Sequence, residues 1–236
     1  MPTPPREIEF KFAVDDDQAF HRLVRHLQLP DTVLDQGVTQ TNHFFDSPQL
    51  CLRNKHSVIR LREQGEKRIL TVKGEKTTRS SNHAVLTDRI EQEAEVSIDA
   101  ATALLQQRTT PQAVIAQYFA DRASDILQAI DSACHGQTLV HIGQFENVRI
   151  HLPETGLDIG GASEMVEFEL DTSTYPDGRI DRELEIEISE HANADAIETA
   201  LTGLLAQAGI EWHSAPSKAV RFFGALKRDG NSQEAP

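Results

Sequence analysis

Charged and apolar residues alternate at every second position in several short stretches of the chain. The first stretch is Glu7–Phe12, which reads Glu-Ile-Glu-Phe-Lys-Phe. Successive side chains of a β-strand point to opposite faces, so this alternation predicts strands with one charged and one apolar face. Further stretches that read as strands are 58–62, 68–73, 89–96, 139–142, 147–152, 165–171 and 183–188.

Apolar residues that recur at three- and four-residue spacing predict helices between these strands. One such helix follows the first strand and ends before Pro30. Residues 97–133 are rich in Ala, Leu and Gln and predict two connected helices, the second beginning at Thr110. Another helix is expected over 193–205, and a short one after Pro216.

About eight strands, no internal repeat and no low-complexity linker predict one α+β domain. We expect an eight-stranded antiparallel sheet that closes into a β-barrel, since this number of strands permits closure. The domain is predicted over residues 1–228, with a helical insertion at about 97–133, and residues 229–236 are predicted to be a disordered tail. With the charged faces inward, the barrel becomes a tunnel with a charged lumen and helices packed outside.

The overall charge limits the partners. The chain has 23 Lys+Arg and 37 Asp+Glu, and a formal net charge of −14. No general attraction to nucleic acid or to anionic lipid is therefore expected, and we predict no nucleic-acid and no membrane partner. No run approaches the ~20 apolar residues that cross a bilayer, and the first residues lack the apolar segment of a signal peptide.

The two cysteines are Cys51 and Cys134. They lie far apart and form no C-x-x-C pattern, which argues against a disulfide framework and against a thiolate zinc site. The sequence therefore predicts a protein with reduced thiols in the cytoplasm.

The charged strand faces carry both signs of charge. Carboxylates are hard ligands that suit Mg²⁺ or Mn²⁺, and Arg and Lys form charge-assisted contacts with phosphate oxygens. A lumen lined by both suits a polyphosphate together with a divalent cation. The alternative is that each charged face is simply the solvent side of an antiparallel sheet.

A set of motifs resembles one family. Glu7–Lys11 is similar to the E-x-E-x-K signature of the CYTH superfamily, the triphosphate tunnel metalloenzymes. Further segments resemble that family's motifs in the same order along the chain. They are Asn42–Pro48, Leu50–Arg53, Val58–Arg62, Leu70–Gly74, Arg89–Glu93, Glu169–Asp171, Glu185–Glu187 and Ser217–Lys218.

The resemblance implies roles for individual residues. Mg²⁺ or Mn²⁺ would be the cofactor, and the implied metal ligands are Glu7, Glu9, Asp171, Glu185 and Glu187. The implied contacts to phosphate oxygens are Lys11, Arg60, Arg62, Lys73, Arg149, Lys218 and Arg221. The residues expected to act in catalysis are Glu7, Glu9, Lys11 and Glu187. Whether Glu91, Glu93 and Arg179 reach the site stays open.

Three activities are compatible with the resemblance: hydrolysis of inorganic triphosphate, hydrolysis of thiamine triphosphate, and the class IV type of adenylyl cyclase reaction. The chain has only two Tyr and one Trp, which leaves few residues to build an aromatic recess for an organic group. This favours a small triphosphate substrate, cleaved to pyrophosphate and phosphate. The non-enzymatic alternative is a polyphosphate-binding module. The oligomeric state is left open, with a homodimer as one option.

Overall fold

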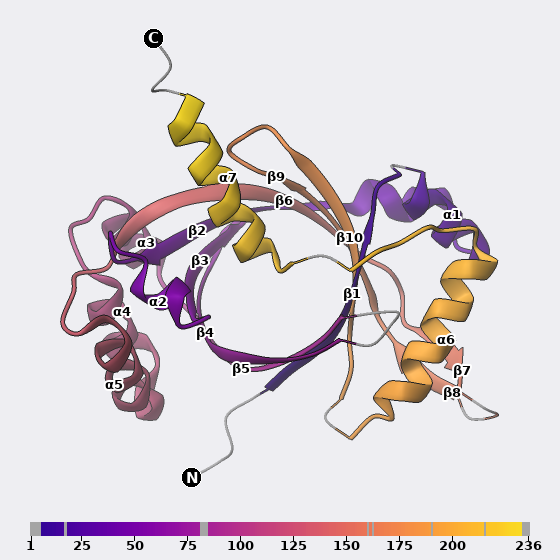
Figure 1. Cartoon of the computed structure of the whole chain (residues 1–236), viewed down its shortest axis with the longest axis horizontal. Helices are drawn as coiled ribbons and strands as arrows, with labels where there is room; N and C mark the ends of the chain where they lie inside the picture. Colours follow the sequence, from indigo (N-terminus) through magenta and orange to yellow (C-terminus); the bar gives the residue numbers. More distant parts are fainter. Residues whose placement is uncertain are drawn as a thin grey trace.

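The computed structural model describes residues 6–16, 18–80, 85–159, 161, 163–189, 191–214 and 216–232. Eight antiparallel strands form one curled sheet, which we call the tunnel sheet (Figure 1). Its strands, in spatial order, are β1 (Arg6–Val14), β10 (Ile180–Glu187), β9 (Phe168–Thr174), β6 (Val140–His151), β2 (Val38–Asp46), β3 (Val58–Gln64), β4 (Lys67–Ser80) and β5 (Val85–Glu95). Strand β5 pairs in turn with β1, so the series of pairings returns to its first strand.

The predicted α+β class and the eight antiparallel strands are confirmed, but some strand limits were wrong. Strand β2 was not predicted as a strand. The two strands expected at 139–142 and 147–152 are one continuous strand, β6. The strand expected at 165–171 is divided, because β8 (Ser163–Val166) pairs with β7 (Thr155–Asp158) in a separate two-stranded sheet.

The strand alternation places the apolar side chains outside the tunnel sheet. On β10, Leu184 and Ile186 are fully buried in the core, whereas Glu183 and Glu185 between and beside them belong to the buried polar set. Two of the three core clusters lie on the outside of the sheet, and the third packs Phe222 and Phe223 against Phe44 and Phe145, which also line the lumen. Most of the remaining lumen lining is polar.

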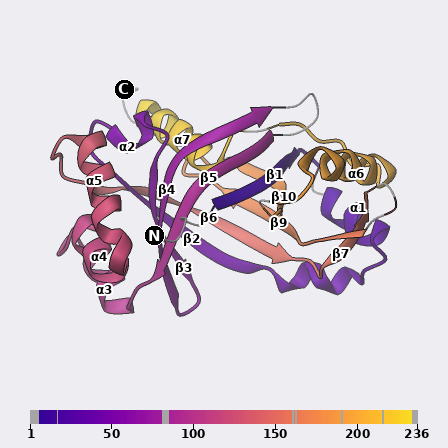
Figure 2. The ribbon, with the colours of Figure 1, turned by 90° about the horizontal axis from the view of Figure 1, so that it is seen from below.

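Helices cover this outer wall on two sides (Figure 2). On one side lie α1 (Ala19–His26), the 3₁₀ helix η1 (Asp31–Gln36) and α6 (Ala194–Gln207). On the other side lies the insertion, formed by α3 (Ile98–Leu105), α4 (Pro111–Tyr118), η2 (Ala120–Arg122) and α5 (Ala123–Cys134). It has three α-helices where two were predicted. None of the helices in the described ranges is long and apolar enough to span a membrane.

Helix α7 (Lys218–Ser232) packs against β2 and β6 through Phe222 and Phe223. A register shift between Phe44 and Phe45 lies where β6 carries Gly143, whose φ is 149°. A Cβ at Gly143 would lie 3.2 Å from the Phe222 ring, so the glycine permits this close approach. The helix continues to residue 232, past the point at which a tail was predicted to begin, and residues 233–236 lie outside the described part.

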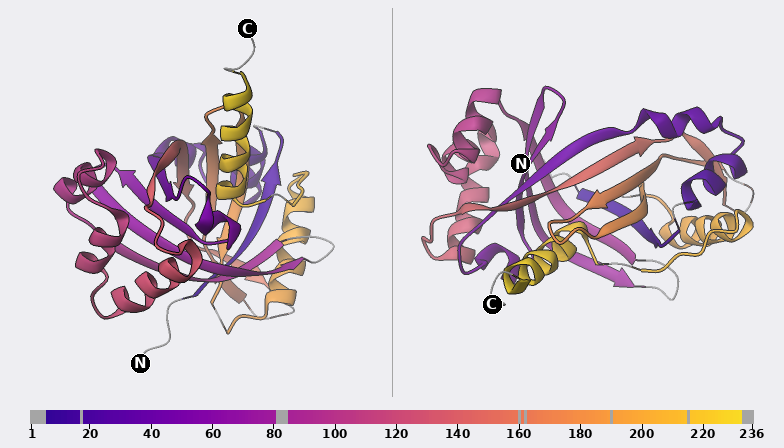
Figure 3. Two further views of the ribbon diagram at one scale, coloured as in Figure 1. Left: turned by 60° about the vertical axis from the view of Figure 1, so that its left-hand side comes forward. Right: turned by 90° about the horizontal axis from the view of Figure 1, so that it is seen from above.

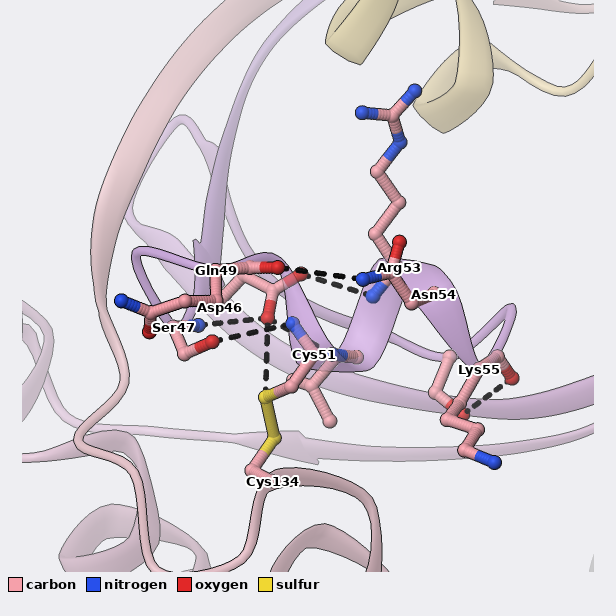
Figure 4. Close-up of a disulfide and its surroundings, with 10 residues drawn as sticks. Asp46, Ser47, Gln49, Cys51, Arg53, Asn54, Lys55 and Cys134 are labelled. Carbon is pink, nitrogen blue, oxygen red and sulfur yellow. Dashed lines mark hydrogen bonds between the residues drawn. A yellow bond between two sulfur atoms is a disulfide. The ribbon is translucent and has the colours of Figure 1, made fainter.

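A disulfide joins Cys51 and Cys134, contrary to the prediction of reduced thiols (Figure 4). Cys51 begins α2 (Cys51–Asn54) and Cys134 ends α5, with Cα atoms 5.2 Å apart across 83 residues of sequence. Sequence spacing could not predict this pairing, because the packing of the insertion against α2 brings the cysteines together. Asp46 accepts hydrogen bonds from the backbone N–H groups of Leu52 and Arg53 and so fixes the start of α2.

Helix α2 also lies beside α7 (Figure 3). The guanidinium of Arg53 is 5.0 Å from the centre of the Phe223 ring, at the distance of a cation–π contact. The disulfide, α2 and α7 thus form a continuous set of contacts from the insertion to the helix that carries Lys218.

Candidate functional site

The lumen contains a cavity of about 540 Å³, which we call the tunnel cavity. Alternate residues of the strands line it, because every second side chain of a strand in the curled sheet points inward. The lining includes Glu7, Glu9, Lys11, Arg60, Arg62, Lys73, Arg149, Glu185, Glu187 and Lys218. All of these were predicted as site residues, and the structure brings them into one cavity.

Three glutamates from two adjacent strands form an acidic part of the tunnel cavity. Glu9 of β1 is the register partner of Glu187 of β10, and Glu7 lies two residues before Glu9. Burial raises the pKa of the Glu187 carboxyl above its usual value, and the negative charges of Glu7 and Glu9 add to this shift. A divalent cation would relieve this repulsion, and the oxygen donors are of the type that Mg²⁺ and Mn²⁺ prefer. These three residues therefore fit the expected metal.

Two lysines connect the acidic part to the rest of the lumen. The Lys11 ammonium lies 2.9 Å from a Glu9 carboxylate oxygen and also pairs with Glu185. The Lys73 ammonium lies 3.0 Å from Glu7 and 2.6 Å from Glu91. Each lysine thus holds a glutamate of the acidic part in place.

Strands β2 and β3 provide a different environment. The Arg62 side chain donates from Nε to the Asn42 amide oxygen at 3.2 Å. Burial, together with the neighbouring guanidinium groups of Arg60 and Arg149, lowers the pKa of Arg62 to about 9. In the part of the chain that the structure describes, no carboxylate lies within ion-pair distance of Arg62. An anion such as a phosphate would neutralise this buried charge.

Asp171, an expected metal ligand, does not line the tunnel cavity. It is fully buried, and its carboxylate accepts hydrogen bonds from Arg149 at 2.9 and 2.5 Å, Asn147 at 2.7 Å and Lys218 at 2.7 Å. Burial alone would raise the pKa of Asp171, but the charges of Lys218 and Arg149 hold it below its usual value. Asp171 therefore positions two cations that line the cavity.

Oxygen atoms of Glu169, Asp171 and Glu185 lie within 4.8 Å of one another. Arg149 contacts all three carboxylates, and its guanidinium is 2.5 Å from an oxygen of Glu185. In this arrangement the arginine neutralises the three carboxylates, and Glu185 is shared between Arg149, Lys11 and Lys218.

The structure separates two residues at the start of α7 that were expected to face the tunnel together. Lys218 lines the tunnel cavity and contacts Asp171 and Glu185. Arg221 does not line it, because its guanidinium pairs with Asp181 at 2.9 Å and with Glu183. The expected contact between Arg221 and phosphate is therefore not supported by its position.

The residues that were left open are now placed. Glu91 and Glu93 line the tunnel cavity, and Glu93 accepts a 2.7 Å hydrogen bond from Thr71. Arg179 is not in the lining, and its guanidinium stacks 4.8 Å from the Tyr175 ring centre.

Sequence reasoning missed the amide residues of the lumen, the lining residue Glu169 and one arginine. Gln40, Asn42 and Asn147 line the tunnel cavity from β2 and β6. The alternation Gln40, Asn42, Phe44 was a period-two signal, but it lacks the charges that marked the other strands. Arg122, at the end of η2, also lines the cavity, and only the folding of the insertion brings it there.

Residues 5–223 match the family model of the CYTH domain, so the chain belongs to the CYTH family. HpAC1 of Hippeastrum, a protein with a dominant triphosphatase activity, is 23% identical with a TM-score of 0.70, and the alignment covers 92% of this chain and 95% of that one. A candidate adenylate cyclase of Bacillus halodurans is also 23% identical, with a TM-score of 0.63 and coverage of 92% and 98%. These structures share the fold, and no curated protein sequence matches.

Proposed function

We propose that this protein hydrolyses the terminal phosphoanhydride bond of a triphosphate with the help of Mg²⁺ or Mn²⁺. The observation that carries the proposal is the division of one cavity into an acidic part, Glu7, Glu9 and Glu187, and a basic part around Arg60, Arg62 and Arg149. A triphosphate and its divalent cation need both parts. The triphosphatase activity named for HpAC1 agrees with this assignment.

The residues of the lumen have separate tasks in the proposed reaction. Arg60, Arg62 and Arg149 would bind phosphate oxygens and offset the negative charge that must be held in the transition state. Lys11 and Lys218, held by Glu185, would bind further phosphate oxygens. Because their partners fix these cations before substrate binds, little reorganisation is needed during the reaction.

The glutamates Glu7, Glu9 and Glu187 would hold the divalent cation. The cation would supply charge neutralisation and an activated water molecule. Inorganic triphosphate, cleaved to pyrophosphate and phosphate, is the smallest substrate that satisfies both parts of the cavity.

Phosphate release should be measured with inorganic triphosphate, thiamine triphosphate and ATP, each with and without Mg²⁺ or Mn²⁺. The ATP reactions should also be examined for cyclic AMP and pyrophosphate. We expect metal-dependent phosphate release from inorganic triphosphate, reduced at least ~100-fold in a Glu9→Gln variant.

The matched control is Glu95→Gln, which makes the same change on an exposed glutamate of β5 outside the cavity lining. Both variants should first be shown to fold by thermal melting. Binding of triphosphate without release of phosphate under any metal condition would contradict the hydrolase and support a polyphosphate-binding module. Formation of cyclic AMP would instead support the cyclase.

A further inference from the structure

A second cavity, of about 670 Å³, lies between the outer face of the tunnel sheet and the insertion. We call it the insertion recess. Its walls are mostly apolar, in contrast to the lumen. The apolar lining residues are Leu52, Val58, Ile59, Val72, Ile90, Phe119, Ala120, Ile126, Ala129 and Ile130.

The insertion recess adjoins the tunnel cavity. Val58, Lys73 and Arg122 line both. Val58 and Lys73 are register partners of β3 and β4, so the two cavities meet at one place on the rim of the tunnel sheet. At this junction the Lys73 ammonium already contacts Glu7 and Glu91 inside the tunnel.

Arg122 is the charged contribution of the insertion to this junction. Arg122 is partly exposed, and among the described residues no carboxylate lies within ion-pair distance of its guanidinium. A guanidinium that has not been neutralised by a carboxylate can bind phosphate oxygens through its fork of donors. The junction thus combines a free cationic group with an apolar space directly behind it.

We propose that the insertion adds a second part to the substrate site. Arg122 binds phosphate oxygens at the junction, and the insertion recess takes an apolar organic group carried by the end of the triphosphate remote from the phosphate that is released. This inference rests on the proposed function and specifies its substrate class as an organic triphosphate monoester. Inorganic triphosphate would occupy the tunnel cavity alone.

The reaction itself is unchanged. A water oxygen forms a bond to the terminal phosphorus, the bond from that phosphorus to its bridging oxygen breaks, and the electron pair leaves with the organic diphosphate. The proton of the water passes to solution. The recess therefore alters which substrate binds, and the lumen residues keep their tasks.

The chemistry of the recess also defines what kind of organic group fits. Six of its seventeen lining residues carry polar or charged side chains, and the rest of the wall is mostly aliphatic with one aromatic ring, Phe119. The six are Ser57, Lys73, Gln92, Asp121, Arg122 and Asp125. Such a wall stabilises apolar surface but leaves the hydroxyl groups of a sugar poorly paired. The scarcity of Tyr and Trp does not prevent an organic-group site, since aliphatic side chains build it.

Phenyl triphosphate and inorganic triphosphate are suitable probes. Their dissociation constants can be compared by calorimetry in EDTA, so that no turnover occurs. We expect the phenyl ester to bind the wild-type protein ~10-fold more tightly than inorganic triphosphate, because the ring is removed from water. Phosphate release from both compounds with Mg²⁺ is measured separately.

An Ala129→Trp variant fills the recess from an exposed position of α5. It should abolish the preference for phenyl triphosphate and leave the affinity for inorganic triphosphate within ~2-fold. Ser124→Trp, at an exposed position of the same helix that does not line the recess, is the matched control and should change neither affinity.

Arg122→Gln tests the junction, with Arg108→Gln at an exposed site of the insertion as control. We expect the Arg122 variant to bind both ligands ~10-fold more weakly and the control to bind both as the wild-type protein does.

Equal affinity of the wild-type protein for both ligands, or a preference that survives Ala129→Trp, would contradict the proposed role of the recess. Unchanged affinity in Arg122→Gln overturns the role of Arg122. Failure of the wild-type protein to release phosphate from either compound contradicts the proposed function, and the binding comparison still decides the recess.

Discussion

Two walls of the tunnel neutralise their cations in different ways. On the wall formed by β6, β9 and β10, Arg149 is held by Glu169, Asp171 and Glu185, and Lys218 contacts the last two. On the wall formed by β2 and β3, Arg62 is bonded to the Asn42 amide. The cations of the first wall are paired with carboxylates of the protein. On the second wall Arg60 lies 3.5 Å from Glu93, whereas Arg62 has no carboxylate within ion-pair distance among the described residues and retains its positive charge.

This difference separates support from recognition. A buried cation that is already paired contributes a fixed position, and removing its partner leaves a buried charge without compensation. A buried cation beside other cations is disfavoured until an anion arrives, as the lowered pKa of Arg62 indicates. The comparison therefore predicts large stability effects on the first wall and large ligand effects on the second.

The largest effect is expected at Asp171. An Asp171→Asn variant keeps the shape of the side chain but leaves Arg149 and Lys218 with less negative charge at a fully buried position. The free energy of unfolding should fall by ~3–5 kcal/mol, the usual loss when one partner of a buried ion pair is removed. Urea unfolding measures this free energy.

Asp131→Asn, at an exposed position of α5, is the control and should change stability by less than ~0.5 kcal/mol. An equally small loss at Asp171 would mean that this wall is not held by its ion pairs.

The second effect concerns Arg62. An Arg62→Gln variant should retain the wild-type melting temperature or exceed it, because the substitution removes a buried charge that has no carboxylate partner among the described residues. Its affinity for triphosphate should fall ~10–100-fold, since a charge-assisted hydrogen bond to phosphate is lost.

Melting curves with and without triphosphate measure both quantities, because ligand binding to the folded state raises the melting temperature. Arg149→Gln provides the contrast, and we expect it to melt lower even without ligand. If Arg62→Gln and wild type gain the same stabilisation from triphosphate, the second wall does not recognise the anion.

The smallest effect is a pH dependence of stability at Glu91. Burial and the neighbouring Glu7 raise the pKa of its carboxyl to about 7, against the opposing charge of Lys73. The folded protein therefore binds more protons at this site than the unfolded chain between about pH 4.5 and 7, and stability falls as the pH rises through this window.

A Glu91→Gln variant should lose this contribution, so its stability relative to wild type should increase by ~1 kcal/mol or more from pH 4.5 to 7.5. Urea unfolding in EDTA at several pH values provides the measurement. Glu95→Gln, an exposed neighbour on β5, should run parallel to wild type. Parallel curves for Glu91→Gln as well would show that Lys73 fully compensates the burial.

The sequence was most informative where charge and period two coincide. On β1 and β10 the alternation of Glu or Lys with apolar residues directly indicated which side chains face inward. The register of Glu9 with Glu187 comes from the pairing of the two strands, which that pattern does not specify. It was less informative on β2, where neutral amides replace the charges at Gln40 and Asn42. Strand β6 was divided in the prediction because Gly143 and Gln144 interrupt the apolar pattern.

The remaining differences between the predicted and the observed arrangement depend on tertiary packing. Asp171 shares the sequence pattern of the lumen carboxylates, but the cations of β6 and α7 surround it and keep it from the cavity. Arg221 follows Lys218 by one helical turn, yet Asp181 and Glu183 bind it away from the cavity. Arg122 and the Cys51–Cys134 pair belong to the insertion, whose position relative to the strands has no local sequence signal.

The bond between Cys51 and Cys134 makes the chain a closed covalent ring over part of its length. This ring contains β3, β4 and β5, and with them Arg60, Arg62 and Lys73, whereas β1 and β10 lie outside it. A chain cut once between α3 and α4 would therefore remain one covalent molecule, with both segments still joined through the sulfur atoms. Both edges of this segment pair with strands that precede it in the chain, β3 with β2 and β5 with β1, and the later strands β6, β9 and β10 complete the tunnel between β2 and β1.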